Sequence, residues 1–151
     1  MARERLSEHF FLDELLVSDT ADRFGIANTP PPAHLAHIRK RLVPGLERAR
    51  EILGNRAIVV TSAYRNPVIN KMVGGTATSA HPLGYAADIR VAGLTHFAVA
   101  RKLAASDLKF DQLILEISRN IVHLSFDPRL RGQVKTQAKG PGTAIVDGLP
   151  E

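Results

Sequence analysis

Two histidines and one aspartate have the residue types and the spacing of a metal-binding set. Asp88 follows His81 by seven residues, and His123 follows Asp88 by 35 residues within an apolar run. Two neutral imidazoles and one carboxylate supply three ligands, which leaves a fourth tetrahedral position open for the water that a hydrolytic zinc must activate. Because the chain contains no cysteine, a zinc site can use only His and Asp or Glu. We therefore predict a Zn²⁺ site formed by His81, Asp88 and His123, although a lone His and Asp would equally fit a surface or capping pair.

Length and composition predict one globular domain that does not insert into a membrane. A chain of 151 residues, 44% of them hydrophobic, can bury its own core without disulfides or a partner. No apolar run approaches the roughly 20 residues of a membrane-spanning helix. The N-terminus carries charges where a secretory signal would have its apolar stretch, so no signal peptide is visible. We expect a monomer that is made in the cytoplasm.

The net charge of +5 is unevenly distributed along the chain. Residues 1–32 carry three basic and six acidic side chains, whereas residues 33–56 carry six basic and two acidic ones. Such a basic patch favours polyanions, either nucleic acid or an anionic cell wall. The sequence lacks the interleaved aromatics, the basic recognition helix and the Cys/His finger of nucleic-acid-binding domains. We therefore do not expect nucleic acid as a partner.

The order of the expected elements is that of an α+β domain. Residues 1–32 form an N-terminal segment packed on the core, residues 33–136 form the core, and residues 137–151 form a loose C-terminal tail. Apolar spacing predicts a helix over 33–53 that Pro44 kinks or splits, and a second helix over 94–105. Apolar and β-branched runs predict strands at 57–61, 86–91, 111–117, 121–126 and, as an edge strand, 133–136.

A short helix is expected to begin at Pro67, with Asn66 as its N-cap, and to end near residue 74. Arg65 precedes this helix start. Unsatisfied backbone N–H groups and a guanidinium fork together favour a carboxylate ligand. We therefore predict that Arg65 binds a substrate carboxylate; the alternative is a solvated loop arginine. Ser79, two residues before His81, is a candidate to orient the substrate or to stabilise the turn.

The last two strands of the core are expected to form a hairpin around Arg119 and Asn120. A two-residue turn there places Glu116 directly opposite His123 and gathers the apolar residues of both strands on the other face. Directly opposed side chains have Cβ atoms roughly 4.5–5.5 Å apart. This register puts a carboxylate beside the third predicted ligand, where a general base for zinc-bound water belongs. The alternative is a surface Glu–His pair on a solvated face.

The sequence contains three distinctive motifs, Ser62-Ala-Tyr-Arg65, Ser79-x-His81-x-x-Gly84-x-Ala86-x-Asp88 and Val122-His123-Leu-Ser-Phe126. Together they resemble the zinc D-alanyl-D-alanine carboxypeptidase family, peptidase family M15, and its short phage- and bacteria-borne branch. The resemblance runs from about Phe10 to Gln133 and implies a single small α+β domain of the hedgehog/DD-peptidase type, with a central antiparallel sheet flanked by helices. It also implies zinc ligands at His81, Asp88 and His123.

The chain departs from many of these relatives at one position. They place the catalytic glutamate three residues before the last ligand histidine, and here that position is Asn120, which cannot take up a proton from water. Glu116 is the base that the hairpin register and the short branch of the family favour. We prefer it to Asp111, which lies near the far end of the strand.

The combined pattern predicts a zinc-dependent peptidase that cleaves a D-Ala-containing bond of a peptidoglycan stem peptide, as the resemblance implies. A D-Ala-D-Ala carboxypeptidase is the preferred activity. One alternative is an endopeptidase of the phage endolysin type. Another is a non-catalytic, zinc-containing cell-wall-binding or virion module of the same fold. Without a visible signal peptide, the protein would reach the cell wall after holin-type release or as a virion component.

Overall fold

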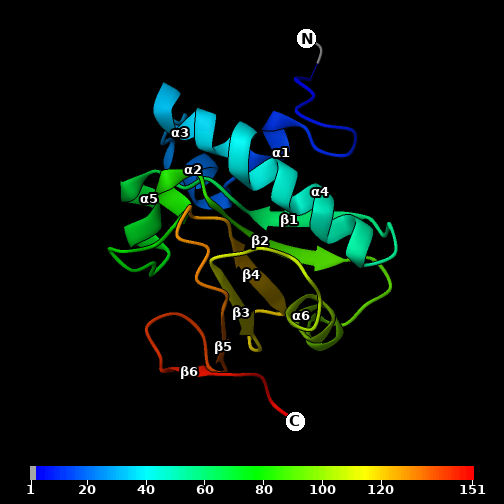
Figure 1. Cartoon of the computed structure of the whole chain (residues 1–151). Helices are drawn as coiled ribbons and strands as arrows, with labels where there is room; N and C mark the ends of the chain where they lie inside the picture. The colour runs from blue at the N-terminus through cyan, green and yellow to red at the C-terminus, as the bar shows by residue number, and fades with distance from the viewer. Residues whose placement is uncertain (1–2) are drawn as a thin grey trace.

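A six-stranded sheet with strand order β1-β2-β4-β3-β5-β6 organises the chain in the computed structural model, which describes residues 3–151 (Figure 1). Neighbouring strands pair antiparallel except β3 and β5, which pair parallel. The α+β class is therefore confirmed, with a mixed sheet in place of a wholly antiparallel one. The strands are β1 Ile58–Ser62, β2 Ala86–Val91, β3 Gln112–Glu116, β4 Ile121–Ser125, β5 Gln133–Gln137 and β6 Ile145–Asp147.

Helices pack against one face of this sheet, and helices also make up most of the chain before β1. Of these, α4 and α6 contact each other, and α6 contacts β2, β3 and β4. No helix among residues 3–151 has the length and apolarity needed to cross a bilayer. The helical elements are α1 Leu12–Leu16, α2 Asp19–Phe24, α3 Pro32–His37, the π-helical turn η1 Ile38–Leu42, α4 Val43–Ile52, α5 Pro67–Met72, the 3₁₀ turn η2 His81–Leu83 and α6 His96–Ala104.

Alternation along the strands divides the sheet into a core face and a polar face. Successive side chains of a strand point to opposite faces, so residues two apart share a face. The core face carries apolar residues that pack against α4 and α6, whereas the opposite face carries Asp88, Ile114, Glu116 and His123. The polar residues that could take part in chemistry therefore lie together on one face of the sheet. The core residues on the strands include Ile58, Val60, Ala87, Ile89, Leu113, Leu115, Val122 and Leu124.

The helix predicted over residues 33–53 is interrupted before Pro44. It is divided into α3, η1 and α4, and the backbone N–H of Val43 donates to the carbonyl of Ile38, five residues earlier. Proline has no N–H and its ring crowds the carbonyl four residues before it. A π-helical turn inserts one extra residue and relieves this conflict. Pro44 therefore does not end the helix: the backbone keeps right-handed helical angles where α3 meets η1 and where η1 meets α4, and the irregularity is a π-helical turn just ahead of the proline.

The predicted register of the β3–β4 hairpin is wrong by two residues. His123 lies opposite Ile114, and Glu116 lies opposite Ile121. The turn spans four residues, 117–120, and Asn120 adopts a positive φ of 56°. The N–H of Asn120 closes this turn on the carbonyl of Ile117, and the N–H of Ile117 donates to the carbonyl of Gln137 in β5. Because the shift is even, Glu116 stays on the same face as His123, as its diagonal neighbour.

The C-terminal region adds two strands beyond the hairpin. The strand expected at the edge, residues 133–136, is β5, and it lies inside the sheet because β6 pairs with it. Residues 145–147, within the segment expected to be a loose tail, form β6. The sheet edge on this side is therefore a short strand of three exposed residues.

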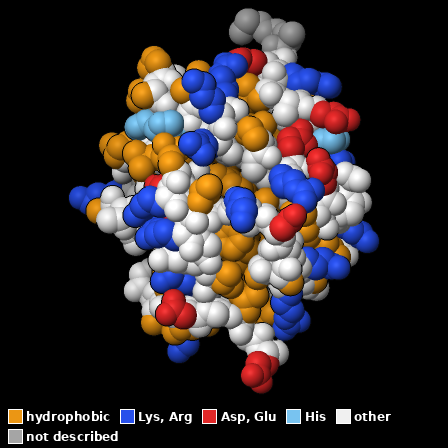
Figure 2. Space-filling view, viewed as in Figure 1, with side chains coloured by type: hydrophobic (Ala, Val, Ile, Leu, Met, Phe, Trp, Pro, Cys, Tyr) orange, Lys and Arg blue, Asp and Glu red, His pale blue; other side chains and the backbone are white. Residues whose placement is uncertain are grey.

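The basic character of residues 33–56 is partly neutralised by ion pairs with acidic residues of the same segment and of other segments. Arg48 forms ion pairs with Glu51 and Asp107, and Arg39 pairs with Glu4. On the face seen in Figure 2, Lys and Arg side chains alternate with Asp and Glu and with apolar areas. This mixed charge pattern gives no continuous basic surface on that face.

Asn28 joins the N-terminal segment to the loop that follows β1. Its Nδ2 donates to the carbonyls of Leu16 and Tyr64, and its Oδ1 accepts from the backbone N–H of Asn66. The N–H of Tyr64 also donates to the carbonyl of Leu15. Residues 62–66 are therefore held from both sides.

We predict that Asn28→Ala lowers the free energy of unfolding by about 2–3 kcal/mol, because three backbone groups lose a partner. Urea denaturation measures this change. Thr29→Ala, an exposed neighbour, serves as the control and should change stability by no more than about 0.5 kcal/mol. Equal stability of the two variants would contradict the role given to Asn28.

Candidate metal centre

His81 is held in one orientation by the loop that follows β1. Its Nδ1 lies 2.6 Å from the carbonyl oxygen of Ala63. A carbonyl only accepts, so Nδ1 carries the proton and Nε2 keeps its lone pair. The Oγ of Ser79 accepts a hydrogen bond from the backbone N–H of His81 at 3.2 Å. Backbone contacts therefore fix both the tautomer and the position of this imidazole.

Asp88 and His123 face each other across neighbouring strands. They are direct partners in the β2–β4 register, and His123 Nδ1 lies 3.1 Å from Asp88 Oδ1. The same carboxylate oxygen lies 3.2 Å from His81 Nε2. One ligand atom from each of the three residues lies within 4.8 Å of the others. The structure thus brings together the three residues that the spacing singled out.

The burial of the three residues, and the pKa shifts of His81 and Asp88, suit a divalent metal. All three side chains are buried, with exposures of 1% for His81, 0% for Asp88 and 8% for His123. Burial lowers the pKa of His81 and so favours its neutral, ligating form. Burial acts to raise the pKa of Asp88, but His81 and His123 together hold it well below its usual value.

Asp88 also has an unsatisfied oxygen. Its Oδ2 is buried and makes no hydrogen bond. The guanidinium of Arg119 lies 3.6 Å from this oxygen, which is an ion pair but longer than a hydrogen bond. A buried carboxylate oxygen without a hydrogen bond is costly, and this favours a bound cation beside it. Two imidazole nitrogens and one carboxylate are a donor set for zinc that leaves a position open. The residues present therefore fit a zinc ion.

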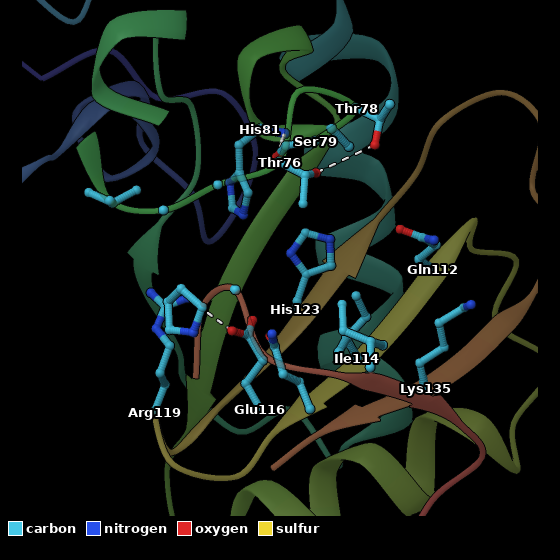
Figure 3. Close-up of a pocket in the computed structure, with 18 of the residues that line it drawn as sticks. Thr76, Thr78, Ser79, His81, Gln112, Ile114, Glu116, Arg119, His123 and Lys135 are labelled. Carbon is cyan, nitrogen blue, oxygen red and sulfur yellow. Dashed lines mark hydrogen bonds and ion pairs between the residues drawn. The ribbon is translucent and has the colours of Figure 1, made fainter. Parts of the chain in front are cut away.

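A pocket of about 470 Å³ lies over the cluster and is lined by His81 and His123. Glu116 lines it too and is 6% exposed. Burial, followed by the nearby charge of Asp88, raises the pKa of Glu116, while Arg119 and His123 oppose the rise. In Figure 3 Glu116 lies below His123 and beside Arg119. A carboxylate is therefore placed next to the cluster, although not directly opposite His123.

Arg119 is a site residue that the sequence analysis treated only as part of a turn. Its Nη1 donates to Glu116 Oε1 at 3.0 Å, and its Nη2 lies 3.6 Å from Asp88 Oδ2. One guanidinium thus lies between the proposed base and a metal ligand. The three-residue separation of Glu116 and Arg119 around a turn was the available signal. The turn length that brings them together was not predictable from that segment alone.

Arg65 is buried and turned into the pocket. It is 7% exposed, lines the pocket and has an Nε with no hydrogen-bond partner. Burial lowers the pKa of Arg65, and the charge of Asp88 opposes this effect. A guanidinium keeps its charge in proteins, so the pocket contains a cationic side chain whose Nε donor is free to bind a ligand. The alternative of a solvated loop arginine is wrong.

Two further residues find structural roles. Ser79 lines the pocket, but its Oγ is used by the backbone of His81. Asp111 is held by Arg131, whose Nε and Nη2 each donate to it at 2.8 Å. This bidentate pair engages both oxygens of Asp111, which leaves Glu116 as the carboxylate beside the cluster.

Comparison with protein families gives one match. The family model described as Peptidase M15 matches residues 8–125. The matched segment contains His81, Asp88, His123, Glu116 and Arg65. No curated protein matches the chain.

We predict that Asp88→Asn abolishes stoichiometric zinc binding. The amide has no charge to compensate the metal, and the loss of affinity should exceed the roughly 10–100-fold that follows loss of an outer partner. Metal analysis after dialysis against a competing chelator measures it. Asp111→Asn, which alters another buried aspartate, should retain zinc; equal zinc content in both variants would refute the ligand assignment.

Proposed function

The chain belongs to the peptidase M15 family and is thereby a metallopeptidase, and we propose that it removes the terminal D-Ala from peptidoglycan stem peptides in a zinc-dependent reaction. The observation that carries this proposal is the shared pocket. Two buried histidines of the candidate metal site, a buried carboxylate and a buried arginine line one cavity. A peptidase acting on a chain end needs these three groups.

His81, Asp88 and His123 would hold the metal. A zinc ion bound there supplies Lewis acidity toward the scissile carbonyl and lowers the pKa of its water toward 7. Glu116 accepts the proton of the attacking water and returns it to the departing amine. Arg119 occupies Glu116 Oε1, so we assign proton transfer to Oε2.

Arg65 would bind the carboxylate of the terminal D-Ala. Its burial excludes water from the ion pair, which strengthens the interaction with an anion. The unpartnered Nε and the fork of the guanidinium suit a planar, two-oxygen ligand. This anchor would set the distance between the chain end and the metal ligands, and so select the bond that is cut.

Two other functions make different use of the same pocket. An endopeptidase would cut the cross-link between two stems and would need room beyond the scissile bond. A non-catalytic wall-binding module would hold zinc without turnover. The buried carboxylate of Glu116, with its raised pKa, favours an enzyme, because carboxyl groups with perturbed pKa values in a pocket are typical of catalytic sites.

We predict that the zinc-loaded protein removes one alanine from a pentapeptide-stem muropeptide, as measured by mass spectrometry, and that a chelator abolishes the reaction. Glu116→Gln should keep zinc and lose roughly 10²–10⁴-fold in kcat, because the amide cannot accept a proton. Glu51→Gln, an exposed substitution on α4, is the matched control. Cleavage of only the cross-linked dimer would reject the proposal in favour of an endopeptidase, and absence of product from both substrates with zinc bound would favour a binding module.

We further predict that Arg65→Ala raises KM for this substrate by about 10–100-fold while zinc stays bound, since a charge-assisted pair contributes about 1.5–3 kcal/mol. Arg65→Lys should recover only part of the loss, because an ammonium lacks the planar fork. Steady-state kinetics with a carboxylate-ended and a carboxamide-ended peptide separate the two effects. If both peptides lose equally, Arg65 does not bind the carboxylate.

A further inference from the structure

Residues 138–144, which join β5 to β6 and are called the strap below, cross from one wall of the pocket to the other. Pro141 packs so closely on Gly74 that a Cβ on Gly74 would lie 3.0 Å from the Pro141 Cβ. A Cβ on Gly140 would lie 3.4 Å from the Oγ of Ser118, in the β3–β4 turn. The strap therefore touches both the loop after α5 and the hairpin turn. It lies outside the segment matched by the family, residues 8–125.

Internal hydrogen bonds give the strap a defined shape. Gln137 Nε2 donates to the carbonyl of Thr143, and the hydroxyl and backbone N–H of Thr143 both donate to the carbonyl of Gly140. Pairing between β5 and β6 fixes its two ends. These contacts make the strap a built wall of the pocket.

The strap lies at the end of the pocket that holds Glu116. In the parallel β3–β5 register, Glu116 pairs with Gln137, the residue from which the strap departs, whereas Gln112 pairs with Gln133 at the opposite end. Figure 3 shows the red ribbon of this region curling beside Glu116 and Arg119, with Gln112 and Lys135 on the far side. Pro141 and Gly142 line the same pocket.

Arg65 belongs to this closed end as well. The charges of Asp88, Arg119 and Glu116 are close enough to Arg65 to affect its pKa. Val73 and Gly74, in the loop after α5, line the pocket together with Arg65. A substrate carboxylate bound to Arg65 would therefore have Pro141 and the strap close to it. The rest of the substrate would extend toward Gln112 and Lys135.

We propose that the strap closes the leaving-group side of the cleft and restricts cleavage to a single terminal residue. This inference rests on the proposed function, and in particular on Arg65 as the carboxylate anchor. A carboxypeptidase releases one free D-Ala, which is small. Cutting a cross-link releases an amine that is still attached to a second stem peptide, and in this proposal the strap obstructs the path of that second stem.

Replacing residues 139–143 with Asn-Gly tests the proposal. Residues 138 and 144 then flank a two-residue hairpin turn, which suits the antiparallel β5–β6 pair. The wild-type protein should process the pentapeptide monomer and not the cross-linked dimer. The shortened variant should raise the ratio of dimer to monomer cleavage by ~10-fold or more, within the range that pocket shape confers on related substrates. Metal content and thermal unfolding establish that the variant is folded.

Pro141→Gly provides a second, milder variant that keeps the length of the strap. It removes the ring that packs on Gly74 and should shift the same ratio in the same direction by a smaller factor. If the wild-type protein cleaves dimer and monomer equally well, or if both folded variants keep the wild-type ratio, the strap does not restrict the substrate. Cleavage of neither substrate by the zinc-loaded wild type would instead overturn the proposed function, and this inference with it.

Discussion

A fully buried carboxylate, that of Asp88, is the constraint on which the rest of the structure depends. A charge removed from water is costly unless neighbouring groups compensate it. Here His81 and His123 converge on one oxygen, and the other oxygen makes no hydrogen bond. This arrangement suits a protein in which a bound cation would contribute to the free energy of folding by compensating the buried charge. Each element around Asp88 can be understood by what it contributes to that compensation.

The sheet places a compensating side chain beside Asp88 because successive side chains of a strand alternate between its two faces. β2 and β4 place Asp88 and His123 opposite each other, while the residues on either side of them in sequence point into the apolar core. A substitution that shifted either strand by one residue would bury the polar side chains and expose the apolar ones. The site is therefore protected by the same pattern that forms the core.

Sequence reasoning reached the parts of the site that local pattern determines. The ligand set, the face that carries it and the Asn66-capped helix after Arg65 all follow from spacing and residue type. The hairpin register did not, because a two-residue and a four-residue turn leave the same side chains on each face, so the apolar pattern cannot distinguish them. Arg119 was missed for the same reason. Its contact with Glu116 forms across the four-residue turn, residues 117–120.

The hydrogen bonds around residues 62–66 have a consequence for how the two ends of the fold communicate. Ala63 accepts from His81, while its neighbour Tyr64 is held by Leu15 and Asn28 of the N-terminal segment. Any state in which that segment detaches loosens the loop and frees the imidazole to change its tautomer. For a metal held by His81, its affinity and the docking of residues 10–28 would be thermodynamically linked, and each would strengthen the other by the same coupling free energy. The first helices of the chain are in this sense a remote part of the metal site.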